Sequence, residues 1–206
     1  MNRVAMSKLS SEQLFLTKAA KALLDKDEDS PFLNLSRYQL WDLAGVDGLQ
    51  LVKRLASDVV EKIAPFQSID FIFTGYQYSV LRLGEENYRL GLYGDLGTYG
   101  GLNFEEAIAS AKIGLQVWAK PCDTMQTIAI PEATALDLLP RIAVVKPPYH
   151  LEELPPNCAV PATIQEIPTL IWRHRLLSET VFELHSAVQD AEMIGTAAAQ
   201  ARSGAR

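Results

Sequence analysis

The stretch YRLGLYGDLGTYGGLNFEEAIASAKIGLQVW, Tyr88–Trp118, decides how the middle of the chain is interpreted. It opens with the alternating residues of a strand, passes through four glycines and ends in an alanine-rich segment with helical spacing. Asn103 and Glu106 have the spacing of a capping box. Glutamates in the first turn already complement the helix dipole, and the glycine spacing matches no phosphate-binding loop. We therefore interpret the glycines as a hinge between strand and helix.

The residues before this stretch predict a hairpin that turns at residues 84–87. That turn would place Leu83 opposite Tyr88 and Arg82 opposite Arg89. One face of the hairpin would then belong to the core and collect Leu81, Leu83, Tyr88, Leu90 and Leu92. The opposite face would collect the residue types enriched in binding hot spots, with Tyr76, Tyr78, Arg82, Arg89 and Tyr93 as candidate partner-binding residues. Either a protein partner or another segment of the same chain covers this face.

The chain as a whole predicts an α+β fold: an antiparallel sheet with flanking helices and a long C-terminal helix. Helical patterns cover residues 10–24 and 36–44, and a further helix is expected from Asp47 to Ala64. The expected organisation is an N-terminal helical segment (1–45), an α+β core domain (46–146), a Pro-rich connector (147–168) and a C-terminal helix (169–206).

The expected C-terminal helix carries a seven-residue spacing of apolar residues. Leu170, Leu177, Leu184, Ala191 and Ala198 form one set, and His174, Val181, Val188 and Gly195 form the other. This stripe predicts either packing on the chain's own sheet or a two-stranded coiled coil. Candidate oligomerisation residues are Ile108, Ala111, Leu115 and Trp118 in a helix over 104–119, with Leu177, Val181, Leu184 and Val188 in the last helix.

Composition excludes several classes of protein. The net charge of −6 and pI of about 5.1 disfavour a nucleic-acid partner. No run of about 18 apolar residues predicts membrane insertion, and the first residues lack a secretory leader pattern. Cys122 and Cys158 form no framework of disulfides, so we expect reduced thiols and a cytoplasmic location.

No motif predicts a catalytic residue, a cofactor or a metal. Asp25, Asp27 and Asp29 alternate as in a calcium loop, but the glycine and glutamate that such a loop needs are absent from the sequence. His174 and His185 would lie about 16 Å apart on the expected helix, too far to share a metal ion.

Residues 49–146 resemble the small dimeric chaperones of bacterial type III secretion. The resemblance rests on the order helix, strands, helix, strands, and on Tyr93-Gly94 and Asn103-Phe104 within the quoted stretch. It implies a homodimer formed through the helix at 104–119 and an extended client wrapped over the sheet.

The predicted function is accordingly a non-enzymatic chaperone or adaptor that binds a protein client. Two alternatives stay open. One is a structural subunit of a larger assembly, such as a secretion apparatus or virion, that docks through its C-terminal helix. The other is an enzyme with a small-molecule pocket near Gly94–Asn103.

Overall fold

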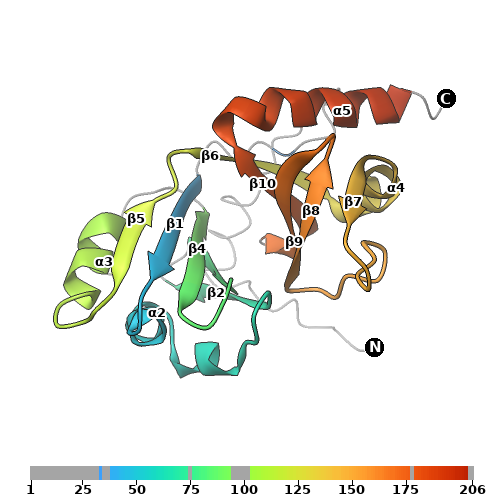
Figure 1. Ribbon diagram of the computed structural model, residues 1–206. Helices are drawn as coiled ribbons and strands as arrows, with labels where there is room; N and C mark the ends of the chain where they lie inside the picture. Colours follow the sequence, from blue (N-terminus) through green and yellow to red (C-terminus); the bar gives the residue numbers. More distant parts are fainter. Residues whose placement is uncertain (1–32, 34–37, 74–75, 94–102, 177–178, 204–206) are drawn as a thin grey trace, which may run out of the picture.

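A computed structural model describes residues 33, 38–73, 76–93, 103–176 and 179–203 of the chain. It contains two five-stranded antiparallel sheets and helices that cover them, which confirms the predicted α+β class (Figure 1). The predictions for residues 10–24, for the acidic segment 25–29 and for the glycine loop 94–102 lie outside the described residues.

The first sheet has the strand order β2-β3-β4-β1-β5. Its strands are β1 (Tyr38–Ala44), β2 (Ser68–Phe73), β3 (Tyr76–Arg82), β4 (Asn87–Tyr93) and β5 (Trp118–Pro121). One face of this sheet is covered by α2 (Gly48–Leu55), η1 (Asp58–Lys62) and α3 (Phe104–Ala111).

The alternation of residues in β4 shows why this sheet has two buried faces. Tyr88, Leu90 and Leu92 belong to the core beneath the helices, whereas Arg89 and Tyr93 face the opposite way. The helices add apolar side chains at helical spacing to that core: Leu51, Val52 and Leu55 from α2, and Phe104, Ala107 and Ile108 from α3.

The predicted capping box of α3 is present. The Asn103 carboxamide oxygen accepts a hydrogen bond from the Glu106 backbone N–H (2.8 Å), and the Glu106 carboxylate accepts one from the Asn103 backbone N–H (3.2 Å).

The second sheet has the strand order β6-β10-β9-β8-β7. Its strands are β6 (Met125–Pro131), β7 (Ala143–Val145), β8 (Cys158–Ile164), β9 (Ile167–Leu176) and β10 (Glu179–Ala187). On its outer face lie α4 (Glu132–Ile142) and α5 (Ala191–Ser203), the latter reached through η2 (Val188–Asp190). The core beneath them includes Leu138 and Leu139 of α4, Ile194 of α5, and Phe182 and Leu184 of β10.

The inner faces of the two sheets lie against each other, so helices form the outside of both halves (Figure 1). Two small apolar clusters join the sheets. One contains Leu33, Tyr93, Ala129, Leu176 and Val181; the other contains Leu81, Ala159 and Trp172.

The predicted hairpin is present, but its register is wrong by one residue. Tyr88 lies opposite Arg82, and Arg89 lies opposite Leu81. Because successive residues of a strand face opposite sides, this shift exchanges the two faces of β3 and leaves those of β4 as predicted. Tyr78 and Val80 therefore belong to the core under the helices, and Leu81 faces the second sheet.

Several predicted helices are wrong in extent or type. Residues 38–44 form strand β1, and the helix expected over 104–119 ends at Ala111, before β5. Most of the helix expected from residue 169 is instead formed by β9 and β10, and in the described part of this segment the α-helix is limited to Ala191–Ser203. Strand β8 lies in the expected connector 147–168, so the four predicted segments do not match the boundaries of the two sheets.

No helix in the described ranges is long and apolar enough to cross a membrane.

Candidate functional site

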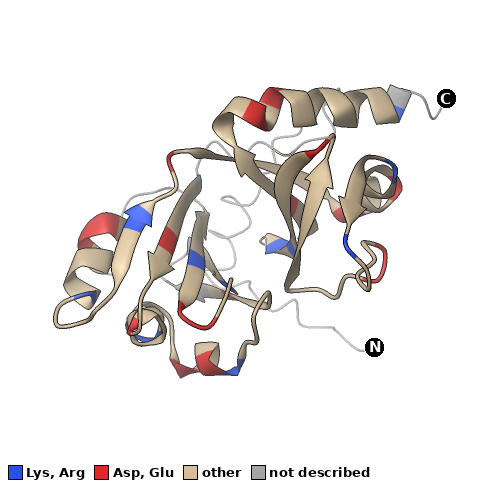
Figure 2. Cartoon of the chain, in the orientation of Figure 1, with Lys and Arg blue, Asp and Glu red and all other residues tan. Residues whose placement is uncertain are grey.

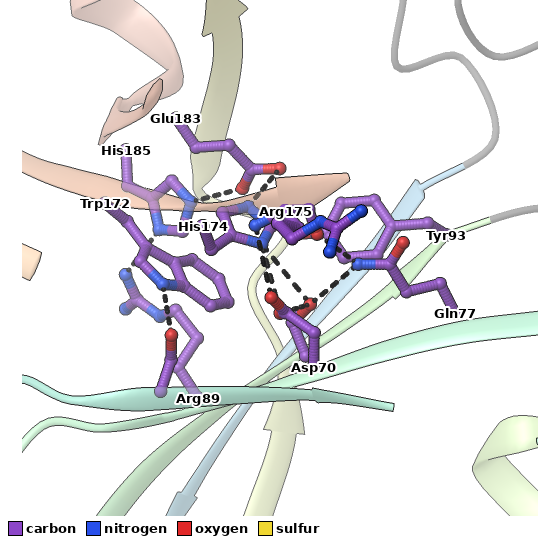
Figure 3. A network of polar contacts seen from close by, with 11 residues as sticks. Asp70, Gln77, Arg89, Tyr93, Trp172, His174, Arg175, Glu183 and His185 are labelled. Atoms are coloured by element: carbon purple, nitrogen blue, oxygen red, sulfur yellow. Dashed lines mark hydrogen bonds and ion pairs between the residues drawn. The ribbon is translucent and has the colours of Figure 1, made fainter. Parts of the chain in front are cut away.

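Charged and polar side chains from six strands meet between the two sheets. Figure 3 shows those from β2, β3, β4, β9 and β10. The first sheet supplies Asp42 from β1, Asp70 from β2, Ser79 from β3, and Arg89 and Tyr93 from β4; the second supplies His174 from β9, and Glu183 and His185 from β10. We call these eight residues the inter-sheet network.

His174 is at the centre of the network and has no solvent exposure. Its Nδ1 lies 3.3 Å from an Asp70 carboxylate oxygen, and its Nε2 lies 3.2 Å from a Glu183 carboxylate oxygen. The Ser79 hydroxyl donates to the same Asp70 oxygen (2.6 Å) and lies 3.4 Å from His174 Nδ1. A carboxylate on each side favours the imidazolium form of His174.

The network continues from Glu183 toward Asp42. His185 Nε2 lies 3.0 Å from the second Glu183 oxygen, and Arg89 donates to His185 Nδ1 (3.1 Å). A guanidinium is always a donor, so Nδ1 must accept, and the proton of neutral His185 is on Nε2. Arg89 also makes a two-pronged contact with Asp42, at 2.7 and 2.9 Å.

Neighbouring groups hold the network in place. The Trp172 ring stacks on His174 with centroids 4.1 Å apart, and its indole N–H donates to the Ser68 hydroxyl (2.9 Å). The second Asp70 oxygen accepts from the Arg175 backbone N–H (3.1 Å), and Gln77 donates to the Arg175 carbonyl. Both sheets thus contribute donors and acceptors to the same contacts.

The environment shifts the pKa values of three network residues. Burial by itself lowers the pKa of His174, but the Glu183 and Asp70 carboxylates outweigh burial and raise this pKa to about 9. Burial raises the pKa of Glu183, but the two histidines outweigh it and lower this pKa to about 2. Burial, followed by the Arg89 and His174 charges, lowers the pKa of His185 against the opposite effect of Glu183. At neutral pH the network therefore holds a charged His174 and a neutral His185.

The network has the composition of an acid–base centre but the accessibility of a core. His174 and Glu183 are 0% exposed and His185 is 1% exposed, so a substrate cannot reach them in this conformation. The arrangement joins the two sheets through the contact of His174 with Asp70 and through that of Arg89 with His185. The contacts of His174 with Glu183 and of Arg89 with Asp42 fix neighbouring strands within one sheet.

Sequence reasoning missed this network because residues 169–187 were predicted to be helical. The sequence does contain a signal for a strand here, because polar and apolar residues alternate with a period of two. Glu183 and His185 share one face of β10, and Phe182 and Leu184 lie on the other. His174 and His185 lie on adjacent strands and both contact Glu183, which corrects the predicted separation of about 16 Å along a helix.

The candidate partner-binding residues do not form an exposed face. Tyr78 is buried against Phe104 of α3, while Arg89 and Tyr93 belong to the inter-sheet network. Arg82 donates to the backbone carbonyls of Ile63 (2.9 Å) and Gly84 (3.1 Å). Tyr76 is the first residue of β3. The structure therefore supports the alternative in which the chain covers this face itself.

The candidate oligomerisation residues are scattered. Ile108 is in the core, and Ala111 and Leu115 pack against it. Val181 and Leu184 are buried in β10, Val188 is exposed in η2, and Leu177 lies outside the described residues. Trp118 is 52% exposed on the edge strand β5.

The two cysteines, Cys122 and Cys158, are free thiols. Burial, followed by the Asp42 carboxylate, raises the pKa of Cys122 to about 12, so this thiol is protonated at neutral pH. Within the described residues, no group of three or more His, Cys, Asp or Glu side chains is arranged to hold a metal ion.

No protein-family model and no curated protein sequence matches the chain. Solved structures do resemble its fold. The glycine cleavage system aminomethyltransferase T from Bartonella henselae aligns with a TM-score of 0.58 at 14% identity, over 79% of this chain and 43% of that chain. The chain thus spans less than half the length of the aminomethyltransferase.

A second similar structure is a chain of the heterotetrameric sarcosine oxidase from Corynebacterium sp. U-96, solved in complex with pyrrole 2-carboxylate. It aligns with a TM-score of 0.54 at 15% identity, over 96% of this chain and 95% of that chain. At these identities the two likenesses define the fold, and both neighbours are enzymes or parts of enzymes.

The predicted function as a chaperone or adaptor is therefore wrong. The solved structures that share the fold are enzymes or parts of enzymes, and Tyr78, Arg89 and Tyr93 of the expected client-binding face are buried. The alternative of a secretion-apparatus or virion subunit required docking through a helix from residue 169, but residues 169–176 belong to β9 and residues 179–187 to β10.

Proposed function

We propose that this chain is a subunit of a heteromeric enzyme of the sarcosine oxidase kind. The observation that carries the proposal is the extent of the structural match: it runs over 96% of this chain and 95% of one chain of a heterotetramer. The aminomethyltransferase match covers 43% of its chain, so it relates this fold to only part of a larger enzyme.

The geometry of the inter-sheet network supports a scaffolding role for the subunit. His174 and Glu183 have no solvent exposure. His174 forms ion pairs with both Glu183 and Asp70. In this proposal the chain itself does not carry the catalytic centre, and the network keeps its two sheets in a fixed relation to each other.

The proposal includes the cellular location. We propose that the subunit works in the cytoplasm, because its two cysteines are free thiols and one of them is buried in reduced form.

The test is isolation of the native complex. The full chain is tagged at its C-terminus and purified from its own host cells, and the molar mass of the complex is measured by native mass spectrometry. We expect a complex with at least one different chain, in fixed stoichiometry, that consumes oxygen when sarcosine is added. A chain that purifies alone, or a complex inert toward sarcosine and other N-methyl amino acids, contradicts the proposal.

A further inference from the structure

The contact between Arg89 of β4 and His185 of β10 is a place where the inter-sheet network crosses from one sheet to the other (Figure 3). Arg89 Nη1 lies 3.1 Å from His185 Nδ1, and both side chains are buried. This crossing needs a neutral histidine, whereas the crossing from His174 to Asp70 is strongest with an imidazolium. The two crossings therefore respond to pH in opposite ways.

The hydrogen bonds of His185 fix its protonation state. A guanidinium has N–H donors and no acceptor, so the Nδ1 that faces Arg89 must offer a lone pair. The other ring nitrogen, Nε2, lies 3.0 Å from a Glu183 carboxylate oxygen and carries the proton, because an ionised carboxylate accepts and does not donate. A second proton can bind the ring only at Nδ1. It would place two N–H donors face to face.

Arg89 has a second partner that keeps its charge compensated. Its Nε and Nη2 donate to the two Asp42 carboxylate oxygens, at 2.7 and 2.9 Å. Asp42 and Arg89 are opposite each other in the β1–β4 ladder, and Figure 2 shows the acidic position of β1 and the basic position of β4 on these neighbouring strands. The guanidinium can therefore lose His185 and still keep both bonds to a carboxylate.

Charges on several elements act on His185. The charged and titratable groups around it are Glu183 of the same strand, Arg89 of β4 and His174 of β9, and behind them Asp42 of β1, Asp70 of β2, Lys120 of β5 and the Cys122 thiol. Its neighbours in the ladders of β6 and β9, Thr127 and Leu170, are uncharged. Burial, with the charges of Arg89 and His174, lowers the pKa of His185 against the effect of Glu183. The second proton therefore binds only in acid.

The β2 side of the joint does not depend on that proton. His174 has a pKa of about 9 and stays charged beside Asp70 as the pH falls. The Trp172 indole donates to the Ser68 hydroxyl (2.9 Å), and the Ser68 backbone N–H donates to the Asn157 carbonyl (2.8 Å). These contacts hold β2 against the second sheet when the contact between β4 and β10 is lost.

We propose that the Arg89–His185 contact is an acid-sensitive latch between the two sheets. A proton from water binds His185 Nδ1, the hydrogen bond from Arg89 Nη1 to this nitrogen breaks, and Arg89 stays paired with Asp42. The sheets remain joined at β2 and lose a contact between β4 and β10. The latch thus sets how tightly the sheets are joined, and this inference does not rest on the proposed function.

NMR of the full chain tests the latch without any substitution. The protein is labelled with 15N-histidine and 15N-arginine, and the exposed His150 serves as an internal reference. At pH 7.5 we expect the Nε2–H tautomer of neutral His185. Between pH 6.5 and 5 we expect Nδ1 to become protonated, and the guanidinium signals of Arg89 to shift with the same midpoint. A ring that stays neutral to pH 5, or one that titrates while the Arg89 signals stay constant, overturns the proposal.

A substitution of Arg89 tests whether the contact and the proton are coupled. Arg89→Gln removes both the positive charge and the group that can only donate, so we expect the His185 titration to move to higher pH. The matched control is Arg141→Gln, which breaks the exposed pair with Asp137 and should leave this titration unchanged. An unchanged midpoint in folded Arg89→Gln overturns the latch. If this variant does not fold, the titration of the unsubstituted protein decides.

Urea unfolding between pH 7 and pH 5 provides an independent readout. A lowered histidine pKa stabilises the folded state fully above pH 6.5, and this contribution is lost as the pH falls toward the folded-state pKa. The urea midpoint should therefore decrease more in the unsubstituted protein than in His185→Gln, which cannot take up the proton. His150→Gln should behave like the unsubstituted protein. Equal decreases in all three proteins would assign the acid sensitivity to other groups and overturn the latch.

Discussion

At the scale of single residues, His174 shows how burial and charge oppose each other. Moving an imidazolium out of water is costly, yet Asp70 and Glu183 surround this one closely enough to keep it charged. Replacing a whole buried ion pair by apolar residues often leaves the free energy of unfolding unchanged. Removing one member lowers this free energy, because the other member stays buried without a counter-charge. The energetic importance of the inter-sheet network is therefore best measured one residue at a time.

Glu183→Gln removes the carboxylate shared by the two histidines while keeping nearly the same volume. We expect a loss of about 3 kcal/mol or more in the free energy of unfolding, measured with urea, because His174 loses one of its two counter-charges. The matched control is Asp137→Asn, which breaks the exposed pair with Arg141 in α4 and should cost less than about 0.5 kcal/mol. Equal effects in the two variants would show that the network does not fasten the sheets.

The stability of the protein should depend on pH through His174. Its pKa is raised from 6.5 to about 9 in the folded state. A raised histidine pKa stabilises the folded state fully below pH 6.5, and this contribution is lost as pH rises through 9. We expect a decrease of about 3 kcal/mol over this range, from the 1.36 kcal/mol that each pKa unit represents.

Urea unfolding at pH 6, 7.5 and 9 checks this expectation. The His174→Gln variant should lack the decrease and show only the background from other groups. A decrease of the same size in the variant would assign the pH dependence to other residues.

At the scale of elements, glycines have opposite roles in a turn and in a helix. Gly45, between β1 and α2, has a φ of +137°, and a Cβ there would lie 2.5 Å from the Gln116 carbonyl oxygen. Gly195 is within α5, and a Cβ there would meet no atom within 4 Å. The first position requires glycine, and the second does not.

Alanine substitutions at these two glycines should change stability in opposite directions. Gly45→Ala should cost about 1–3 kcal/mol, because the backbone conformation is strained for alanine and the turn must move away from Gln116. Gly195→Ala should stabilise by about 0.5–1 kcal/mol, because alanine favours the helix. Thermal melts followed by circular dichroism measure both effects. A Gly45→Ala variant with an unchanged melting temperature would contradict the described turn.

At the scale of the whole molecule, the two sheets are joined by apolar clusters and by the inter-sheet network. The Trp172 indole donates a hydrogen bond to Ser68 of the first sheet and stacks on His174 of the second. Each half has its own helix-covered core, so the joint between the sheets decides whether the halves unfold together.

We expect the sheets to unfold in one cooperative transition. Hydrogen exchange followed by mass spectrometry should give peptides from β3–β4 and from β9–β10 the same free energy of opening, within about 0.5 kcal/mol, and Glu183→Gln should lower both. A half that opens at a free energy lower by about 2 kcal/mol or more would show that each sheet folds independently.

The sequence by itself determined the features that depend on near neighbours. The capping box at Asn103 and Glu106, the hairpin of β3 and β4 and the alternation within β4 all follow from spacings of a few residues. The order of helical and strand patterns along the chain was sufficient for the α+β class. These features could be predicted because local backbone geometry sets them.

Only the tertiary structure decided the rest. The apolar stripe over residues 170–184 fits a helix or two strands. The pairing of β9 with β10, and the packing of both against the first sheet, select strands. Arg89 has the pattern of a surface residue, yet Asp42 and His185 from distant segments bury it as part of a charged network. Side chains 47 and 96 residues from Arg89 set its environment, and no local spacing contains that information because long-range packing determines burial and charge compensation.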